Sequence, residues 1–296
     1  MTTLPHPLYS SFDNSFSIHL SRTYNLSILL GRDRFSFCFN RHDDNCLIGL
    51  ESYGFSISNT QLSSQNDALE WCKELSILLE SLDALKKPFH KVGIAVECHK
   101  STLIPGELFS EGNQNELLLF NQPVEEFEFY RHEQIPKLEA ELIYAIPSCI
   151  VSALHSIFPE TEISNASGQM IETLLKTSHE PVGDGKLYAN VRGDWVEIIC
   201  IEKEKLRYFN SFQYRTREDL AYYIIFVIEQ LGLNPDTITL LLMGNIERES
   251  ERFELLFRYI RNIRLINKSL TKVGKQMLID FPVSNYFNLL SFAKCV

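Results

Sequence analysis

The stretches LSILLGRDRFSFCF (Leu26–Phe39) and LYANVRGDWVEIIC (Leu187–Cys200) decide the fold, because they share one pattern at an offset of 161 residues, from position 26 to position 187. Each contains an apolar run, a turn with Gly and Asp, and a second apolar or alternating run, which is typical of two antiparallel strands joined by a hairpin. In this alignment Asp33 falls on Asp194. A hairpin that recurs in this way predicts two copies of one structural unit.

Each hairpin is followed by a third strand-like run and then by alternating helical and strand-like segments. The predicted strands are Tyr24–Leu30, Arg34–Asn40, Cys46–Ser56, Lys91–His99 and Thr161–Ala166 in the first half, and Lys186–Arg192, Trp195–Ile201, Lys205–Tyr214, Asp236–Ile246 and Asn262–Asn267 in the second. The predicted helices are one capped by Asn66 that ends before Pro88, then Pro147–Phe158, Ser167–Thr177, Thr216–Gly232, Arg248–Ile260 and Ser284–Cys295. This repeated order predicts an α/β protein of two tandem domains. The alternative is two unrelated α+β domains whose hairpins match by chance.

Three compositional features set the predicted domain limits. Residues 1–22 are rich in Ser, Thr, Pro and Asn without a period, which predicts a flexible N-terminal arm. The linker PVGDG (Pro181–Gly185) separates a first domain at 23–180 from a second at 186–296. An acidic, β-rich insertion at about 110–146 enlarges the first domain, and its expected strands are Glu116–Phe120, Glu125–Arg131 and Glu139–Ala145.

Composition excludes several classes of protein. Of the 296 residues, 45% are hydrophobic and 22% charged, which is typical of folded chains. The net charge of −10 excludes attraction of the whole protein to nucleic acid or anionic lipid and leaves only a local patch for such contacts. The first twenty residues lack Lys and Arg, unlike a secretory signal, and the apolar windows Tyr222–Ile228 and Thr237–Met243 are shorter than the roughly 20 residues of a membrane span. We therefore expect a cytoplasmic protein without a transmembrane helix.

The cysteines and the common catalytic motifs point to no chemistry of their own. Seven cysteines form an odd set without a CxxC pair, and Cys38, Cys98 and Cys200 lie inside strand-like apolar runs. We interpret the cysteines as reduced core thiols. The patterns HExxH, GxSxG and GxGxxG do not occur, so we predict neither a catalytic residue nor a metal site.

The order of the predicted elements resembles two tandem ribonuclease H-like domains, which is the actin-like ATPase fold. Ile143–Ala166 followed by the second meander resembles the matching stretch of actin-like pilus- and division-assembly ATPases. The phrases TLIPGELF (Thr102–Phe109), YFNSFQYRTREDLAYYI (Tyr208–Ile224) and LMGNI (Leu242–Ile246) resemble a bacterial family known as domain of unknown function 3822, from about residue 24 onward. The resemblance implies an α/β fold of two tandem ribonuclease H-like domains, the first with a β-rich insertion. It implies no activity.

The resemblance also implies where a nucleotide would bind. Actin-like ATPases hold ATP between their domains, where an Asp-x-Gly turn in each meander approaches phosphate and hydrated magnesium. The first turn falls on Leu29-Leu30-Gly31 and the second on Asn190-Val191-Arg192, so both carboxylates are missing. The glycine pair that admits adenosine becomes Gly244-Asn245. Because Leu offers no magnesium ligand and Asn a weaker one than a carboxylate, we expect no ATP hydrolysis and no cofactor. Binding of ATP without hydrolysis stays an alternative.

The positions that match this cleft and its turns form the candidate ligand-binding set: Gly31, Asp33, Asn190, Arg192, Gly193, Asp194, Gly244 and Asn245. A guanidinium such as that of Arg192 can hold an anion through two hydrogen bonds. The alternative is a turn residue in water. Asp33 and Asp194 either touch a ligand or are explained by the preference of Asp for hairpin turns.

Two charged stretches are candidate partner surfaces. Between Glu254 and Asp280 no acidic residue occurs, and the basic residues there are Arg258, Arg261, Arg264, Lys268, Lys272 and Lys275. They either contact nucleic acid or another acidic surface, or form a solvated face. Residues 107–141 hold nine Glu and two basic residues, so self-association through oppositely charged patches is a further candidate. The aromatic segment Ser284–Cys295 either docks on its own domain or binds a membrane.

These patterns lead to three hypotheses. The first is a non-catalytic actin-like scaffold or regulatory partner in an assembly, because the two-domain repeat is intact and the phosphate turns are degenerate. The second is a nucleotide- or anion-binding enzyme or sensor that uses the candidate cleft. The third is an RNA- or ribosome-associated factor that uses the basic stretch.

Overall fold

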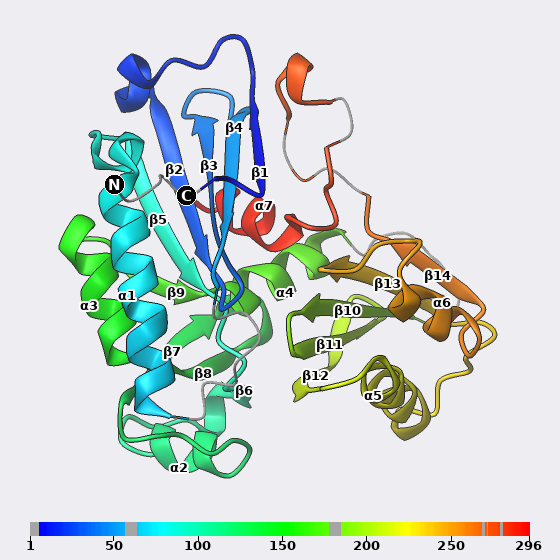
Figure 1. Cartoon of the computed structure of the whole chain (residues 1–296). Helices are drawn as coiled ribbons and strands as arrows, with labels where there is room; N and C mark the ends of the chain where they lie inside the picture. Colours follow the sequence, from blue (N-terminus) through cyan, green and yellow to red (C-terminus); the bar gives the residue numbers. More distant parts are fainter. Residues whose placement is uncertain (1–5, 57–63, 178–184, 268–269, 271, 279–280) are drawn as a thin grey trace.

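The computed structural model describes residues 6–56, 64–177, 185–267, 270, 272–278 and 281–296 (Figure 1). In these ranges the strands form three sheets, two large ones and a small one. Short 3-10 turns lie at Ile18–Thr23, Asp83–Lys86, Gly106–Leu108, Pro136–Leu138 and Lys275–Leu278. In the described part of the chain, no helix is long and apolar enough to cross a membrane.

The first large sheet has six strands, with a meander on one side and parallel strands on the other. Their order is β1 (Tyr9–Phe12), β4 (Leu47–Gly54), β3 (Arg34–Arg41), β2 (Tyr24–Leu30), β5 (Lys91–Val96) and β9 (Ile163–Asn165). β2, β3 and β4 pair antiparallel, whereas β2, β5 and β9 pair parallel. The helices α1 (Gln65–Ser81) and α3 (Ser148–Ile157) contribute to the hydrophobic core on one face of this sheet.

The second large sheet has the same arrangement. Its order is β12 (Lys205–Gln213), β11 (Trp195–Glu202), β10 (Lys186–Arg192), β13 (Thr239–Gly244) and β14 (Asn262–Leu265). The first three strands pair antiparallel and β10, β13 and β14 pair parallel. Helices α5 (Arg217–Gln230) and α6 (Glu251–Phe257) cover one face. Both predicted meanders are therefore confirmed as strands, and the strand order of this sheet repeats that of β4-β3-β2-β5-β9.

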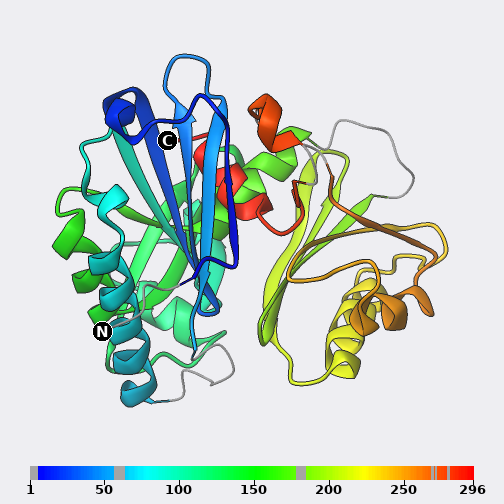
Figure 2. The same ribbon diagram turned by 45° about the horizontal axis from the view of Figure 1, so that its top comes forward.

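Two helices lie between the large sheets. α4 (Ala166–Thr177) and α7 (Phe287–Ala293) stand between them in both views (Figures 1 and 2). One buried cluster contains Leu29 of β2, Tyr188 of β10 and Leu289 of α7. All seven residues of α7 are buried, because its aromatic and aliphatic side chains fill the space that both sheets leave open. Of the two expectations for the C-terminal segment, docking on its own protein is the one observed.

The third sheet lies below the six-stranded sheet in Figure 1 and has the order β6 (Ser101–Pro105), β8 (Ala140–Pro147) and β7 (Glu128–Ile135). The predicted strand at Glu116–Phe120 is wrong, because α2 (Gln114–Leu119) is helical there. Leu118 on this helix packs on Ile143 and Ala145 of β8. A short apolar run has no decisive period, and packing on one face of the small sheet selects the helix. The third strand of this sheet is β6, which precedes the predicted limit of the insertion at residue 110.

The N-terminal segment differs from the predicted flexible arm. Residues 9–12 form β1, which pairs antiparallel with β4 through Tyr9 and Ser52. The ring of Phe12 lies 4.6 Å from that of Phe16, and Phe16 lies 5.1 Å from Phe39 of β3, measured between centroids. Aromatic side chains among the polar residues hold this segment on the sheet.

Side-chain caps fix the starts of two long helices. Thr216 and Asp219 form the capping box predicted for α5, with each side chain accepting a hydrogen bond from the other's backbone. In α1 the cap is Ser64, which pairs in the same way with Asp67, rather than the predicted Asn66. The cysteines are free thiols, and those predicted to lie in the core, Cys38, Cys98 and Cys200, are buried, whereas Cys295 is exposed.

Candidate ligand site

The turns of the two meanders meet where β2, β5, β10 and β13 end. Arg32, in the turn after β2, lies with its Nη1 3.4 Å from Oδ2 of Asp194, in the turn after β10. Beside this pair, Asn245 donates a hydrogen bond to the carboxylate of Asp33. The structure therefore brings the candidate residues of the two hairpins and of the β13 end into one contact region, as the sequence repeat predicts.

The centre of this region is filled by a buried ion pair. Arg192, the last residue of β10, is 2% exposed, and its Nη2 lies 2.5 Å from Oε1 of Glu97, which follows β5 and is 4% exposed. The other oxygen of Glu97 packs on Gly31: a Cβ added there would lie 2.5 Å from Oε2. The place next to the glycine of the first turn is therefore occupied by a carboxylate of the chain itself.

Hydrogen bonds add a third residue to the ion pair and hold a second buried polar group beside it; the two groups together are called the buried network here. Asn288 of α7 donates to Oε1 of Glu97 over 3.0 Å. A second buried carboxylate, Glu197 of β11, accepts from Asn190 over 2.7 Å and from the hydroxyl of Ser167 on α4. The first group ties α7 to the end of β5 and, through Arg192, to β10, and the second ties α4 to β11 of the five-stranded sheet.

This network contains two carboxylates and one guanidinium, and burial governs both acids. Burial raises the pKa of Glu97, and the nearby Arg192 opposes that rise. Burial likewise raises the pKa of Glu197 to about 7, opposed by the hydrogen bonds from Ser167 and Asn190. A single arginine cannot balance two buried charges, so the protonated form of one acid is favoured near neutral pH.

The end of β13 packs tightly on β10. Gly244 has φ +86°, and a Cβ there would lie 2.1 Å from the carbonyl oxygen of Val191. The backbone N–H of Asn245 donates to the same oxygen over 2.7 Å. Only glycine fits this position. Close packing of β13 on β10 therefore explains Gly244, the one glycine at the two positions where actin-like ATPases have a glycine pair for adenosine.

The side chains at the meeting turns do not fit the phosphates and magnesium that actin-like ATPases bind. Leu29 supplies no ligand, the carboxylate of Glu97 lies against Gly31, and Arg192 is already paired. A phosphate placed beside Gly31 would meet the buried carboxylate of Glu97, which is strongly unfavourable. In the described ranges, no group of three or more His, Cys, Asp or Glu side chains is arranged to hold a metal ion.

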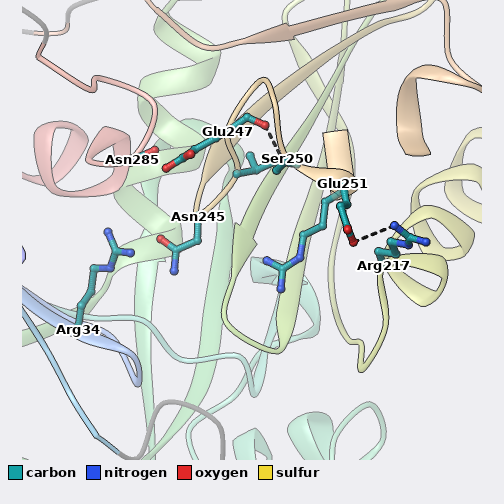
Figure 3. Close-up of a pocket in the computed structure, with 9 residues that line it drawn as sticks. Arg34, Arg217, Asn245, Glu247, Ser250, Glu251 and Asn285 are labelled. Carbon is teal, nitrogen blue, oxygen red and sulfur yellow. Dashed lines mark hydrogen bonds and ion pairs between the residues drawn. The ribbon is translucent and has the colours of Figure 1, made fainter. Parts of the chain in front are cut away.

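A polar pocket of about 580 Å³ lies beside the network (Figure 3). In Figure 3 Asn245 stands between Arg34 on one side and the Arg217–Glu251 pair on the other. Arg217 is bonded to Glu251 over 2.8 Å, and the guanidinium of Arg252 lies 5.4 Å from the ring centre of Tyr214. The pocket offers hydrogen-bond donors to a polar ligand, and we find no nucleophile paired with a base among its lining residues.

The outcome differs between the candidate residues. Arg192 is buried, so its interpretation as an exposed turn residue is wrong. Gly193 and Asp194 form the turn between β10 and β11, where the Asp194 carboxylate also accepts from Gln213 over 3.2 Å. The site residues predicted from the sequence do not include Glu97, Glu197, Ser167 or Asn288. The available signal was a single Glu inside an apolar strand, as in KVGIAVECH, because a buried carboxylate needs a partner.

The basic stretch does not form one surface element. Arg258 caps the end of α6, Arg261 precedes β14, Arg264 lies within β14 and Lys275 begins a 3-10 turn. Lys268 lies outside the described residues. Ile263 faces α6 and belongs to its core cluster, so its neighbour Arg264 faces the opposite side of the sheet. Contact of these residues with nucleic acid stays a prediction.

Comparison with known proteins agrees with this architecture. The family described as "Protein of unknown function (DUF3822)" matches residues 13–263. A Bacteroides thetaiotaomicron protein with an actin-like ATPase fold and unknown function is 24% identical, with a TM-score of 0.80, over 96% of this chain and 100% of that one. A chain of the PilM–PilN type IV pilus biogenesis complex is 11% identical, with a TM-score of 0.67, over 93% and 98%. No curated protein matches the sequence. The predicted resemblance to the actin-like fold is confirmed.

Proposed function

The chain belongs to the family described as Protein of unknown function (DUF3822), and because that description assigns no activity, we propose a function from the geometry of the site. We propose that the chain is a non-catalytic actin-like protein that serves as a scaffold or regulatory partner in a protein assembly. The observation that carries the proposal is the buried pair of Arg192 and Glu97 beside Gly31. It fills the place where an actin-like ATPase needs room for phosphate.

The energetics of this pair favour its persistence. Removing one partner of a buried ion pair costs about 3–5 kcal/mol, because the other charge is left without compensation. A nucleotide phosphate that displaced Glu97 from Arg192 would have to supply that free energy. It would also have to break the hydrogen bond between Asn288 and Glu97. We therefore propose that the chain turns over no ATP and needs no cofactor.

The same proposal includes the organisation of the chain. We propose two tandem ribonuclease H-like domains, at 23–180 and 186–296, in a cytoplasmic protein. The matching strand orders β4-β3-β2-β5-β9 and β12-β11-β10-β13-β14 support the repeat. The small sheet with α2 is then an insertion in the first domain.

The partner is proposed to be a protein. A similar fold occurs in the PilM–PilN complex, where an actin-like chain is a component of an assembly. The region of the small sheet and α2 exposes four apolar side chains within the Glu-rich stretch: Leu108, Leu119, Phe120 and Phe129. Exposed apolar side chains surrounded by charge are typical of protein contact surfaces.

Phosphate release with magnesium and ATP tests the absence of catalysis. We expect no release above the protein-free blank for the wild type and the same result for Asn190→Ala. Magnesium-dependent activity that is lost in Asn190→Ala would contradict the proposal.

Pull-down from native extract tests the scaffold role, because a scaffold captures the same partner with and without added ATP. Capture that requires ATP would overturn it.

The pocket beside Asn245 favours a second candidate, an anion or nucleotide sensor. Three arginines line this pocket and Asn245 lies at its edge. Binding of a ligand to the folded state of such a sensor raises its stability with the logarithm of ligand concentration above the Kd. Nucleotides at millimolar concentration should then raise the unfolding temperature of the wild type but not that of Arg34→Ala. The scaffold hypothesis expects no rise in either protein.

A further inference from the structure

A second cavity lies on the side of the five-stranded sheet that faces away from α5 and α6. It has a volume of about 450 Å³. Lys186 and Tyr188 of β10 are paired with Thr239 and Leu241 of β13, and Leu241 is paired with Arg264 of β14. Alternate residues of a strand share a face, so these five side chains line one surface across three strands.

The charges in this cavity have one sign. Lys186, Arg248 and Arg264 line it, and no acidic side chain does so among the described residues. Within the described ranges none of the three forms an ion pair or a side-chain hydrogen bond. The pocket beside Asn245 is different, because Glu247 and Glu251 line it together with its arginines. In a protein of net charge −10, three unpaired cations around one cavity create a local positive potential.

The floor of the cavity is largely apolar, and three residues of its lining, Thr177, Tyr188 and Thr239, carry hydroxyl groups. Tyr188 is 2% exposed, and Leu241 lies beside it in the next strand. Thr239 is 7% exposed, and in the described structure its side chain has no hydrogen-bond partner. Ligand sites in proteins combine such an apolar surface with a few polar groups that orient the ligand.

We propose that this cavity binds a small organic phosphate. The phosphoryl group lies at the mouth, where Arg248 and Arg264 pair with its oxygens and Lys186 adds a third positive charge. The apolar body of the ligand packs on Tyr188 and Leu241. The dianionic charge of a phosphate monoester matches three cations better than a single carboxylate does. This site is separate from the meander turns, so it does not depend on the proposed scaffold role.

Calorimetric titration with phenyl phosphate, an apolar ring with a dianionic group, tests the proposal. The wild type is expected to bind it with a Kd below about 1 mM, and more tightly than inorganic phosphate or phenol, because only phenyl phosphate uses both the cations and the floor. Arg264→Gln and Arg248→Gln should each weaken binding at least about tenfold. Arg261→Gln is the matched control, because Arg261 is an exposed basic residue of the same stretch that does not line the cavity.

Each outcome decides the proposal. A tenfold loss in the two cavity variants with unchanged binding in Arg261→Gln supports it, provided that the unfolding temperatures without ligand agree. No binding of phenyl phosphate by the wild type at about 5 mM overturns it. Equal loss in all three variants also overturns it, since that result describes general charge attraction. Equal binding of phenyl phosphate and inorganic phosphate also overturns it, because an organic phosphate would then gain nothing from the apolar floor.

Discussion

Replacing Arg192 by Met removes the only guanidinium of the buried network and leaves Glu97 without its charge partner. Both side chains are at most 4% exposed, so water cannot replace the lost contact. The hydrogen bond from Asn288 is then the one contact left at Oε1 of Glu97. Breaking a buried pair in this way costs about 3–5 kcal/mol. Met replaces only the aliphatic part of the Arg192 side chain, so the loss combines the stranded carboxylate with the space that the guanidinium filled, and the double variant separates the two.

The assay is urea unfolding at pH 8 of four proteins: wild type, Arg192→Met, Glu97→Gln and the double variant. The double variant should recover at least about 2 kcal/mol relative to the sum of the single losses, because it strands no charge. Arg207→Met is the control, since Arg207 pairs with Glu202 at the surface, and exposed pairs contribute about 1 kcal/mol or less.

The pH dependence gives a second readout of the same change. Arg192 opposes the rise that burial causes in the pKa of Glu97, so its removal raises that pKa further. A carboxyl whose pKa is raised by folding stabilises the protein below its unfolded pKa and loses that stabilisation as the pH rises toward the folded pKa. The deficit of Arg192→Met should therefore be smaller at pH 5 than at pH 8. A loss no larger than that of Arg207→Met, without recovery in the double variant, would refute the reasoning.

Three further predictions concern the same region and one helix. Burial raises the pKa of Glu197 to about 7, so the wild type should lose up to about 3 kcal/mol relative to Glu197→Gln as the pH rises from 5 to 8, in urea unfolding at both values. Gly244→Ala should lower the free energy of unfolding by more than about 2 kcal/mol in thermal unfolding, because the added Cβ would collide with the carbonyl oxygen of Val191. Gly232→Ala is the control, because φ is also positive there but no atom lies within 4 Å of the added Cβ. It should lose about half as much or less. Thr216→Ala removes the α5 cap and should cost about 1 kcal/mol by the same measurement, and an unchanged stability would exclude the cap as a contributor.

The strands and long helices follow from local patterns. The two hairpins are predicted because apolar runs and turn residues recur within a few positions, and α5 because its apolar stripe and its Thr216 cap lie in one segment. The helix α2 is not predicted correctly, since the run Glu116–Phe120 is too short for its period to decide. Its state depends on contact with β8, which lies more than twenty residues along the chain.

The candidate site is predicted only in part. The repeat indicates which turns meet, because equivalent hairpins end at equivalent edges of their sheets. It does not indicate what fills the space between them. Glu97 and Glu197 lie in strands that read as continuous apolar runs, and their partners Arg192, Ser167 and Asn288 come from distant positions. The members of these pairs meet only in the folded chain, so no spacing in the sequence predicts the pairing.

The position of α7 determines when the protein can finish folding during synthesis. This helix packs on β2 and β3 and on α4, yet it is translated more than 240 residues after β2. The inner face of the six-stranded sheet therefore stays uncovered by α7 while more than 240 residues are translated, that of the five-stranded sheet for a shorter time, and Asn288 reaches Glu97 only after that. Nascent chains in this state are candidates for chaperone binding. Assembly on a partner surface formed across both sheets is then restricted to chains that have been translated at least through this helix.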